Sequence, residues 1–258
     1  MTGNTPSFDL TGRTALITGS TIGIGFAIAE SLAAAGANIV LNGIEDSETA
    51  QASIDVLKTA GQKAWYCQTD LSKRGAAHAL YKAATEKSGA IDILISNAAI
   101  QFGQKLPEIG ENEMDLQFAT NFKASLQLIQ LVLPHMKTQG WGRVITIGSV
   151  QEENHNSNFI VYAALKKAQT HFVCNLAKEY GRFGITFNNI APGIIDTRRN
   201  KDFLSSPENR DSSVSKIPCG RLGKAEDCAG AALLLCSEAG SYINGSNKFI
   251  DGGLRLKF

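Results

Sequence analysis

Short apolar runs and longer helical patterns alternate along almost the whole chain, and this alternation constrains the fold more than any other feature. Residues 14–18 (TALIT) form the first apolar run, and a helical pattern over 23–36 follows it. Residues 38–42 (NIVLN) form the second run, and a helical pattern over 46–60 follows that. A continuous apolar run is typical of a strand that is buried on both faces, as in a parallel sheet covered by helices.

The same alternation continues along the rest of the chain. Further strands are expected at 63–67, 91–95, 143–147, 185–190 and 248–250. Further helices are expected over 73–87, up to about 136, up to about 180 and over 224–237, whereas 197–218 is polar and irregular. Because crossovers are right-handed, this order predicts a doubly wound Rossmann fold of the α/β class, with a mostly parallel sheet of about seven strands and helices on both faces. No linker or repeat divides residues 1–258, so a single domain is expected.

The composition restricts the partners of the chain. With 25 Lys and Arg against 24 Asp and Glu the net charge is +1, so no strong positive field would attract nucleic acid or an acidic membrane. No apolar run approaches the roughly 20 residues that span a bilayer. The amino-terminal residues show no signal-peptide pattern, and the five cysteines form no CxxC pair or zinc-ligand spacing. We therefore expect a cytoplasmic protein with reduced thiols and no metal site.

A glycine-rich turn joins the first expected strand to the first expected helix. Gly19, Gly23 and Gly25 occur in the sequence TGSTIGIG, which begins at the end of the strand. Glycine lets the backbone turn tightly and approach a pyrophosphate closely, while free N–H groups at a helix start face the anion. The spacing Gly-x3-Gly-x-Gly differs from the GxGxxG fingerprint, and a purely structural turn is the alternative. The position within a βαβ series favours a dinucleotide site.

The end of the second expected strand indicates which dinucleotide is bound. A carboxylate at this point suits the free ribose hydroxyls of NAD, whereas Arg or Lys suits the 2′-phosphate of NADP. The strand runs into the sequence NGIED, so Ile44 offers no cation, and Ile22 in the glycine turn offers none either. Glu45 and Asp46 would repel a phosphate. We therefore expect NAD as the cofactor and regard NADP as less favoured.

Other expected strand ends provide further candidates for cofactor contacts. Asp70 follows the third strand, where it either accepts a hydrogen bond from the adenine amino group or is an ordinary turn acid. Residues 96–99 (SNAA) close the fourth strand with small side chains, which permit close approach of a cofactor to Asn97 and Ala98. In an open α/β sheet, ligands bind at the carboxyl ends of the strands, where all these segments lie.

Ser149, Tyr162 and Lys166 form the main catalytic candidate. Tyr162 and Lys166 are four residues apart on an expected helix, so their side chains share one face. A phenol has a pKa of about 10 and is a poor base at neutral pH, but a nearby ammonium group and an oxidised nicotinamide stabilise the phenolate. Tyr162 can then take the proton of an alcohol, while Ser149 donates a hydrogen bond to the substrate oxygen. For the Tyr–Lys pair alone, a solvated helix face is the alternative.

Taken together, these residues resemble the short-chain dehydrogenase/reductase family over essentially the whole chain. The motifs occur in the family's order and approximate spacing: Thr18-Gly19-x3-Gly23-x-Gly25, Asp70, Asn97-Ala98, Asn121, Ser149, Tyr162-x3-Lys166 and Pro192-Gly193. The resemblance implies an oxidoreductase with Tyr162 as general acid/base, Lys166 lowering its pKa and binding the nicotinamide ribose, and Ser149 polarising the substrate carbonyl. It also implies that Asn121 holds a water in a proton relay that leads to Lys166.

The resemblance further implies the dinucleotide contacts. The Ile195 backbone and the Thr197 hydroxyl match the positions that bind the nicotinamide carboxamide. The complete expected set is Gly19, Thr21, Ile22, Gly23, Ile24, Gly25, Ile44, Asp70, Leu71, Asn97, Ala98, Tyr162, Lys166, Pro192, Gly193, Ile195 and Thr197. The sequence departs from the family at 96–99, where Ser-Asn-Ala-Ala replaces Asn-Asn-Ala-Gly. Members usually assemble as tetramers, so a homotetramer or homodimer through 111–136 and 159–180 is expected.

The segment between Ser149 and Tyr162 predicts a polar substrate. Residues 151–158 (QEENHNSN) offer carboxylates, amides and a histidine, which suit a hydroxyl-rich molecule, whereas acyl chains and steroids need an apolar lining. Glu152 and His155 are expected to contact the substrate together with Ser149 and Tyr162, with an exposed loop position as the alternative for His155.

Residues 197–217 match the mobile flap that covers the substrate in the family. Arg198 and Arg199 at its start either grip a carboxylate or phosphate or pair on the surface. The expected activity is the NAD-dependent, reversible oxidation of a sugar, polyol or sugar-acid hydroxyl. The alternatives are a 3-oxoacyl-thioester reductase that uses NADPH and an acyl carrier protein, and, from another class, a non-catalytic dinucleotide sensor. A hydrolase is disfavoured because the chain has no GxSxG elbow.

Overall fold

The structure, a computed structural model, describes residues 7–59 and 61–256. The strands of this part are β1 (Thr14–Ile17), β2 (Asn38–Gly43), β3 (Ala64–Gln68), β4 (Ile93–Ser96), β5 (Gly142–Ile147), β6 (Ile185–Pro192) and β7 (Asn247–Ile250). Its α-helices are α1 (Gly23–Ala34), α2 (Ser47–Thr59), α3 (Ala76–Ser88), α4 (Glu111–Phe118), α5 (Ala124–Gln139), α6 (Ile160–Tyr180), α7 (Lys201–Leu204), α8 (Pro207–Val214) and α9 (Ala225–Cys236). Short 3-10 turns are η1 (Leu106–Glu108), η3 (Val150–Glu152), η4 (Gly181–Phe183), η5 (Arg198–Asn200) and η6 (Glu238–Gly240), and η2 (Ala119–Lys123) is a π-helical turn.

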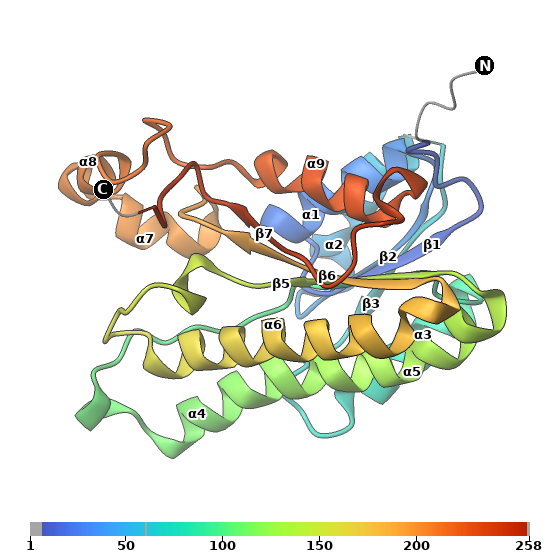
Figure 1. Cartoon of the computed structure of the whole chain (residues 1–258), viewed down its shortest axis with the longest axis horizontal. Coiled ribbons are helices and arrows are strands. Elements are labelled where there is room, and N and C mark those ends of the chain that lie inside the picture. The colour runs from blue at the N-terminus through green and yellow to red at the C-terminus, as the bar shows by residue number, and fades with distance from the viewer. Residues whose placement is uncertain (1–6, 60, 257–258) are drawn as a thin grey trace.

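All neighbouring strands pair in parallel, in the order β3-β2-β1-β4-β5-β6-β7. Leu16 of β1 pairs in register with Val40 on one side and with Leu94 on the other. The chain therefore moves outward from β1 to β3, returns to β4 beside β1, and moves outward again to β7. This reversal opens a crevice at the carboxyl ends of β1 and β4, where ligands bind in such sheets. The predicted doubly wound α/β fold is confirmed (Figure 1).

Helices cover both faces of the sheet (Figure 1), with α1, α2 and α9 on one face and α3, α5 and α6 on the other. Ala15 and Ile17 pack in the first layer, whereas Leu16 packs in the second. Every residue of β1 is buried, which explains why the strand reads as a continuous apolar run. Burial of one such large aliphatic side chain contributes about 1.5–3 kcal/mol.

Some expected elements differ from the structure in extent. The helix expected over 73–87 begins at Ala76, because Gly75 before it has a left-handed conformation with φ 78°. The segment 197–218, expected to be irregular, contains η5, α7 and α8. The helix expected over 46–60 is α2, and residue 60 lies outside the described residues.

The long helix expected to end near Met136 is α4 and α5 joined by the π-helical turn η2. Asn121 lies in this turn and is fully buried. Its Oδ1 accepts a hydrogen bond from Ile100 N at 2.7 Å, and its Nδ2 donates to Ile100 O at 2.8 Å. Turns of this kind occur frequently at functional sites, because they displace one residue from the regular helical face.

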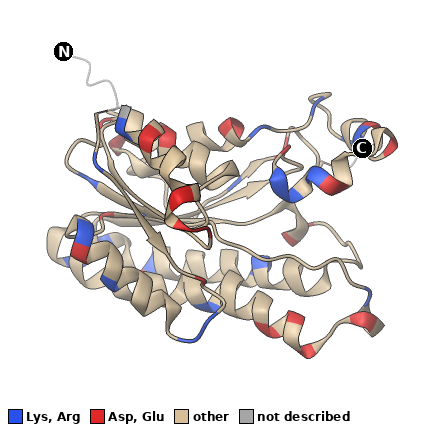
Figure 2. Ribbon diagram, turned by 180° about the vertical axis from the view of Figure 1, so that it is seen from behind, with Lys and Arg blue, Asp and Glu red and all other residues tan. Residues whose placement is uncertain are grey.

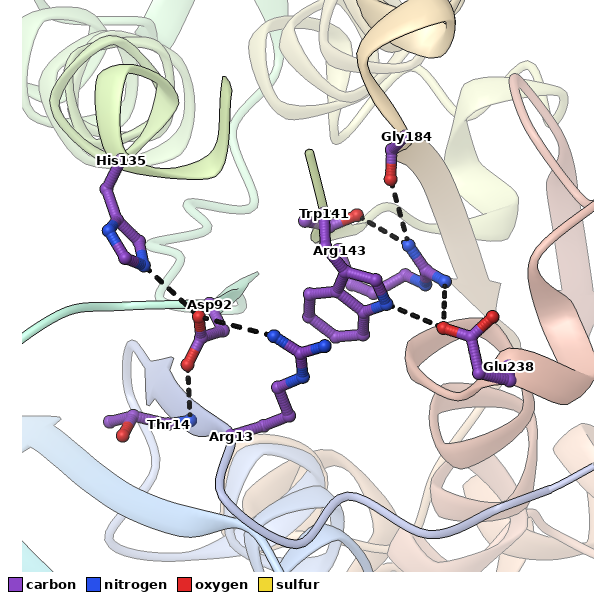
Figure 3. Close-up of polar contacts among 9 residues, drawn as sticks. Arg13, Thr14, Asp92, His135, Trp141, Arg143, Gly184 and Glu238 are labelled. Carbon is purple, nitrogen blue, oxygen red and sulfur yellow. Dashed lines mark hydrogen bonds and ion pairs between the residues drawn. The ribbon is translucent and has the colours of Figure 1, made fainter. Parts of the chain in front are cut away.

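Four residues form a cluster at the amino-terminal edge of the sheet, called the arginine–tryptophan cluster below: Arg13, Trp141, Arg143 and Glu238 (Figure 3). The Cζ atoms of Arg13 and Arg143 lie 3.8 and 4.3 Å from the centroid of the Trp141 ring. Glu238 Oε1 accepts hydrogen bonds from Trp141 Nε1 at 2.6 Å and from Arg143 Nη2 at 3.0 Å. The Arg143 side chain is only 2% exposed, so these contacts offset the cost of burying its charge.

Asp92 extends this cluster toward α5 (Figure 3). Its Oδ2 accepts a hydrogen bond from Thr14 N at 3.0 Å, and its Oδ1 lies 3.2 Å from His135 Nε2. Elsewhere, charges of both signs are interspersed along the chain (Figure 2). Within residues 7–59 and 61–256, no helix is long and apolar enough to cross a membrane, and no three potential metal-ligating side chains gather.

Candidate active site

The glycine turn lies at the crevice between β1 and β4, and its shape requires glycine. Gly19 and Gly23 have φ values of 59° and 64°, in the left-handed region that other residues adopt with strain. A Cβ on Gly25 would stand 2.5 Å from Gly19 O and 2.6 Å from Asn97 Nδ2, so Gly25 leaves no space for a side chain. Ile22 precedes α1 without any side-chain cap, which leaves the first N–H groups of the helix directed at this crevice.

Asn97 and Thr18 fix the turn against the end of β4. Asn97 Nδ2 donates to Thr18 O at 2.9 Å and to Gly19 O at 2.7 Å. Thr18 Oγ1 accepts from the backbone N–H groups of Asn97 and Ala98, each at 3.0 Å. On the other side, Asn42 Oδ1 accepts from Gly19 N at 3.4 Å. Sequence reasoning missed Asn42 as part of this support, although it stands at the strand end that was used to assign the cofactor.

The predicted cofactor-selecting positions at the far end of the crevice carry exposed apolar side chains. Ile22 and Ile44 are 46% and 69% exposed. The Glu45 carboxylate lies against Gly43 and the Thr21 side chain, where a Cβ on Gly43 would meet both. Tyr66 donates its hydroxyl proton to Glu45 O at 2.5 Å, which holds this loop in place.

Asp70 and Leu71 follow β3. Asp70 Oδ1 accepts hydrogen bonds from Ser72 N at 3.0 Å and from Ser72 Oγ at 2.7 Å, and Lys73 Nζ lies 3.8 Å from Oδ2. Asp70 therefore caps a turn, and its contact with the adenine amino group stays a prediction. Leu71 is buried in the core layer under α3.

The catalytic candidates come together from β5 and α6. Ser149 follows β5 and caps η3, with its Oγ accepting from Gln151 N at 3.2 Å. Tyr162 and Lys166 lie one helical turn apart in α6 and are 4% and 1% exposed. Lys166 Nζ donates to Ile147 O at 2.6 Å and to Gln169 Oε1 at 3.2 Å, and lies 5.6 Å from the Tyr162 ring centroid.

Burial determines the protonation of this pair. It raises the pKa of Tyr162, and this effect is opposed by the Arg199 guanidinium and a hydrogen bond from Ser149. Burial also lowers the pKa of Lys166 to about 7, and the positive charge of Arg199 adds to this effect. Burial therefore favours the neutral phenol of Tyr162, while Arg199 and Ser149 act in the direction that a phenolate base requires.

Asn121 is the remaining catalytic candidate, and its side chain is bound to the Ile100 backbone. Each of its polar groups makes one hydrogen bond there and keeps a second site, Nδ2 as a donor and Oδ1 as an acceptor. Its role in a proton relay stays a prediction.

A cleft of about 720 Å³ connects these groups. It is bounded by the glycine turn, the end of β5 with the following loop, the start of α6, and the segment after β6. The predicted site residues that line it are Gly19, Ile22, Gly23, Ile24, Asn97, Ser149, Tyr162, Lys166, Pro192, Gly193, Ile195 and Thr197. The predicted site residues that do not line it are Thr21, Gly25, Ile44, Asp70, Leu71, Ala98, Asn121, Glu152 and His155.

The prediction that Glu152 contacts the substrate was wrong. Its side chain is buried, and its carboxylate accepts hydrogen bonds from Asn247 Nδ2 at 2.7 Å and from Thr170 Oγ1. Burial raises the pKa of this carboxyl group. The loop is therefore anchored to α6 and β7 through Glu152, while His155 is exposed and lies outside the lining.

Of the loop 151–158, amide side chains line the cleft and charged side chains do not. Gln151, Asn154, Asn156 and Asn158 line it on this side, and Gln101 lines it on the β4 side. The polar character of the loop was readable from the sequence, but the direction of each side chain was not. Such a lining offers hydrogen-bond donors and acceptors to a hydroxyl-rich molecule.

Comparisons with known proteins place the chain in a family. Residues 19–255 match a family model described as enoyl-(acyl carrier protein) reductase. The chain is 34% identical to gluconate 5-dehydrogenase from Gluconobacter oxydans, over 96% of this chain and 97% of that protein. It is 36% identical to 7alpha-hydroxysteroid dehydrogenase from Escherichia coli, over 97% of each.

A solved structure extends the comparison to three dimensions. The gluconate 5-dehydrogenase from Burkholderia cenocepacia, in complex with NADP and tartrate, superimposes with a TM-score of 0.91 at 33% identity, covering 98% of this chain and 99% of that one. The residues that match the family model include the glycine turn and Ser149, Tyr162 and Lys166. The chain thus belongs to the short-chain dehydrogenase/reductase family of oxidoreductases, which use a nicotinamide cofactor.

Proposed function

We propose that the protein is an NAD-dependent dehydrogenase that acts reversibly on a secondary hydroxyl group of a sugar acid, sugar or polyol. One observation carries the proposal: Ser149, Tyr162 and Lys166 line the same cleft as the glycine turn, and the remaining wall is rich in amides. The arrangement supports the proposal, because hydride transfer from a carbinol requires a proton-transfer group and a bound dinucleotide at one cavity.

A nicotinamide dinucleotide fits the residues present. Gly19 and Gly25 have no room for side chains, Gly23 has a left-handed φ, and the free N–H groups at the helix start suit a pyrophosphate. When bound, the nicotinamide supplies a hydride acceptor. The segment with Ile195 and Thr197 lines the same cleft and would hold its carboxamide.

The protein residues supply orientation and proton transfer. Ser149 donates a hydrogen bond to the substrate oxygen, and Tyr162 removes the hydroxyl proton during oxidation or returns it during reduction. Lys166, whose pKa of about 7 keeps part of the population protonated at neutral pH, stabilises the Tyr162 phenolate and binds the ribose.

NAD is proposed over NADP because of the residues at the end of β2. Ile44 and Ile22 offer no hydrogen bonds to a phosphate, and the Glu45 carboxylate beside Thr21 would repel one. The Burkholderia cenocepacia enzyme was crystallised with NADP. The proposal therefore implies that this chain differs from that relative in its preferred cofactor. The electrostatics of the chain's own residues support NAD.

A 3-oxoacyl-thioester reductase is the second candidate. The family model carries an acyl-carrier-protein description, and Phe159, Phe203 and Leu254 add apolar surface to the cleft. Seven amide side chains in the same lining favour a hydroxylated substrate instead. A non-catalytic sensor is disfavoured because it would not need the buried Tyr162–Lys166 pair.

A substrate panel with a Tyr162→Phe variant tests the proposal. Sugars, polyols, aldonates and acyl thioesters are assayed with NAD, NADP and their reduced forms. Tyr162→Phe should lower kcat by about 10²–10⁴-fold, since only the transferable proton is lost, while the Kd for NADH stays within twofold. Tyr180→Phe, at the other end of α6, is the matched control and should be unaffected. Near-normal turnover of Tyr162→Phe would falsify the assigned role.

We also propose assembly as a homotetramer or homodimer through α4, α5 and α6, in the cytoplasm. Exposed apolar side chains on this face, Met114, Phe118 and Ile160, support it. Phe118 stacks on Phe122 with ring centroids 5.6 Å apart, which gives the surface a rigid apolar patch. Light scattering of the purified protein at micromolar concentration tests this, and a monomeric mass would contradict it.

A further inference from the structure

The charged side chains that line the cleft are all positive. They are Lys166, Arg198, Arg199 and Lys216, and no Asp or Glu of the described chain lines it. The whole chain is close to neutral, with 25 basic and 24 acidic residues, so this imbalance is local. A cavity with such walls concentrates anions, because low-dielectric walls focus the field.

Arg199 lines the cleft together with Tyr162 and Lys166. Its Nη2 donates to Ala99 O at 2.8 Å, so the side chain connects η5 with the segment after β4. The positive charge of Arg199 opposes the rise in the pKa of Tyr162 and adds to the fall in the pKa of Lys166.

Arg199 has no acidic partner in the part of the chain that the structure describes. Other arginines of the same region do: Arg210 pairs with Asp196 at 2.9 Å, and Arg221 pairs with Asp227 at 2.7 Å. A guanidinium has five N–H donors, so Arg199 keeps donors for a ligand beyond its hydrogen bonds to Ala99 O and to the Tyr162 hydroxyl.

We propose that Arg199 binds a carboxylate of the substrate. A guanidinium binds a carboxylate through two parallel hydrogen bonds, which fixes both its position and its orientation. Arg199 and Tyr162 line the same cleft, so one small molecule can contact both with its carboxylate and its reacting hydroxyl. The substrate class is therefore a hydroxycarboxylate, and this inference rests on the proposed dehydrogenase function.

Arg198 and Lys216 extend the positive wall around this point. A neutral polyol, a steroid or an acyl thioester would leave the Arg199 donors without a charged partner. Such substrates gain no ionic hydrogen bond from Arg199, so the positive wall favours carboxylates over them.

Matched substrates test the proposal. Hydroxy acids that the wild-type enzyme turns over are compared with their primary amides, which keep the carbon skeleton and lose the charge. Arg199→Ala should lower kcat/KM for the acid by about 30- to 300-fold and change that for the amide less than threefold. Arg199→Lys should recover part of the loss. Lys201→Ala, an exposed cation in the adjacent α7 that does not line the cleft, is the matched control.

A binding measurement keeps the test independent of turnover. The complex with NADH is titrated with D-gluconate, L-tartrate, D-3-hydroxybutyrate and neutral D-glucitol while the nicotinamide fluorescence is followed. We expect at least one carboxylate to bind the wild-type complex, at least tenfold weaker binding of that carboxylate to Arg199→Ala, and no difference for D-glucitol. The Kd for NADH itself should be the same in both proteins.

Several outcomes would overturn the inference. Equal losses for acid and amide would assign Arg199 a general structural role, and weaker NADH binding by Arg199→Ala would assign it to the dinucleotide. A wild-type enzyme that turns over only neutral substrates, or a complex that binds none of the carboxylates, would also exclude it. Each of these results would leave the dehydrogenase proposal unaffected. Conversely, a protein that binds a carboxylate through Arg199 but turns over no substrate would reject the dehydrogenase proposal and leave the role of Arg199 in binding intact.

Discussion

Lys166 is buried at a cost to stability, and its replacement by methionine should therefore stabilise the fold while abolishing turnover. The ammonium group is 1% exposed and is balanced by no carboxylate in direct contact; its hydrogen bonds go to Ile147 O and Gln169 Oε1. Methionine has a similar length and no charge, so Lys166→Met removes the desolvation cost with little change in packing.

The pKa of Lys166 gives the magnitude. Burial and the neighbouring Arg199 lower it to about 7, whereas lysine in an unfolded chain has a pKa of about 10.4. At pH 7 this difference corresponds to about 4 kcal/mol of lost stability. Lys166→Met leaves the Ile147 carbonyl and the Gln169 side chain without their donor, which costs about 1–3 kcal/mol. The variant should thus be more stable by about 1–3 kcal/mol at pH 7.

The sign of the pH dependence follows from proton binding. Between about pH 7 and 10.4 the unfolded chain binds more protons at Lys166 than the folded chain does, so the stability of the wild-type protein rises with pH in this window. Lys166→Met lacks this contribution. Its advantage should therefore shrink by about 3 kcal/mol between pH 7 and pH 9.5.

Urea unfolding at pH 7 and at pH 9.5, followed by tryptophan fluorescence and circular dichroism, measures both quantities. Lys167→Met, a substitution of the exposed neighbouring lysine, is the control and should show little pH-dependent difference from wild type in this window. A Lys166→Met protein that is less stable at pH 7, or whose difference from wild type is independent of pH, would refute the reasoning.

Two further predictions concern the cofactor and the opposite edge of the sheet. Ile44→Arg should tighten NADPH binding by about tenfold or more and change NADH binding less than threefold, because it places a cation at the end of β2; unchanged NADPH affinity in a fluorescence titration would contradict this. Glu238→Ala should lower the free energy of unfolding in urea by about 1.5–3 kcal/mol without changing the Kd for NADH, because buried Arg143 loses its charged acceptor. Glu86→Ala, which removes an exposed ion pair, should cost less than about 0.5 kcal/mol, and an equal cost for both variants would argue against the role of Glu238.

The sequence predicted the sheet well because its strands are buried on both faces and therefore apolar throughout. It did not reveal α8, because Pro207–Val214 is polar and has no apolar stripe to detect; the only local signal was Ser206, which caps the helix, followed by Pro207. Nor did it reveal the π-helical turn at Asn121, because one inserted residue barely changes a helical pattern.

The candidate site, like the fold, was predictable from the sequence only in part. Tyr162 and Lys166 were predictable because helical periodicity alone places both on one face. Glu152 was misassigned because the direction of a loop side chain depends on partners distant in sequence, here Asn247, 95 residues away. The reach of Arg199 depends likewise on Ala99, 100 residues away, which no local pattern encodes.

Strand β5 connects two regions that have different roles, one in stability and one in catalysis. Arg143 of the arginine–tryptophan cluster lies near its start, and Ser149 follows its end, about 20 Å farther along at the rise of an extended chain. Sequence variation at the first region would change how long the enzyme survives heat or proteolysis, while each surviving molecule keeps its catalytic constants. Variation at the second would leave the yield of folded enzyme intact and alter what each molecule does. Half-life and turnover can therefore evolve separately on a single strand.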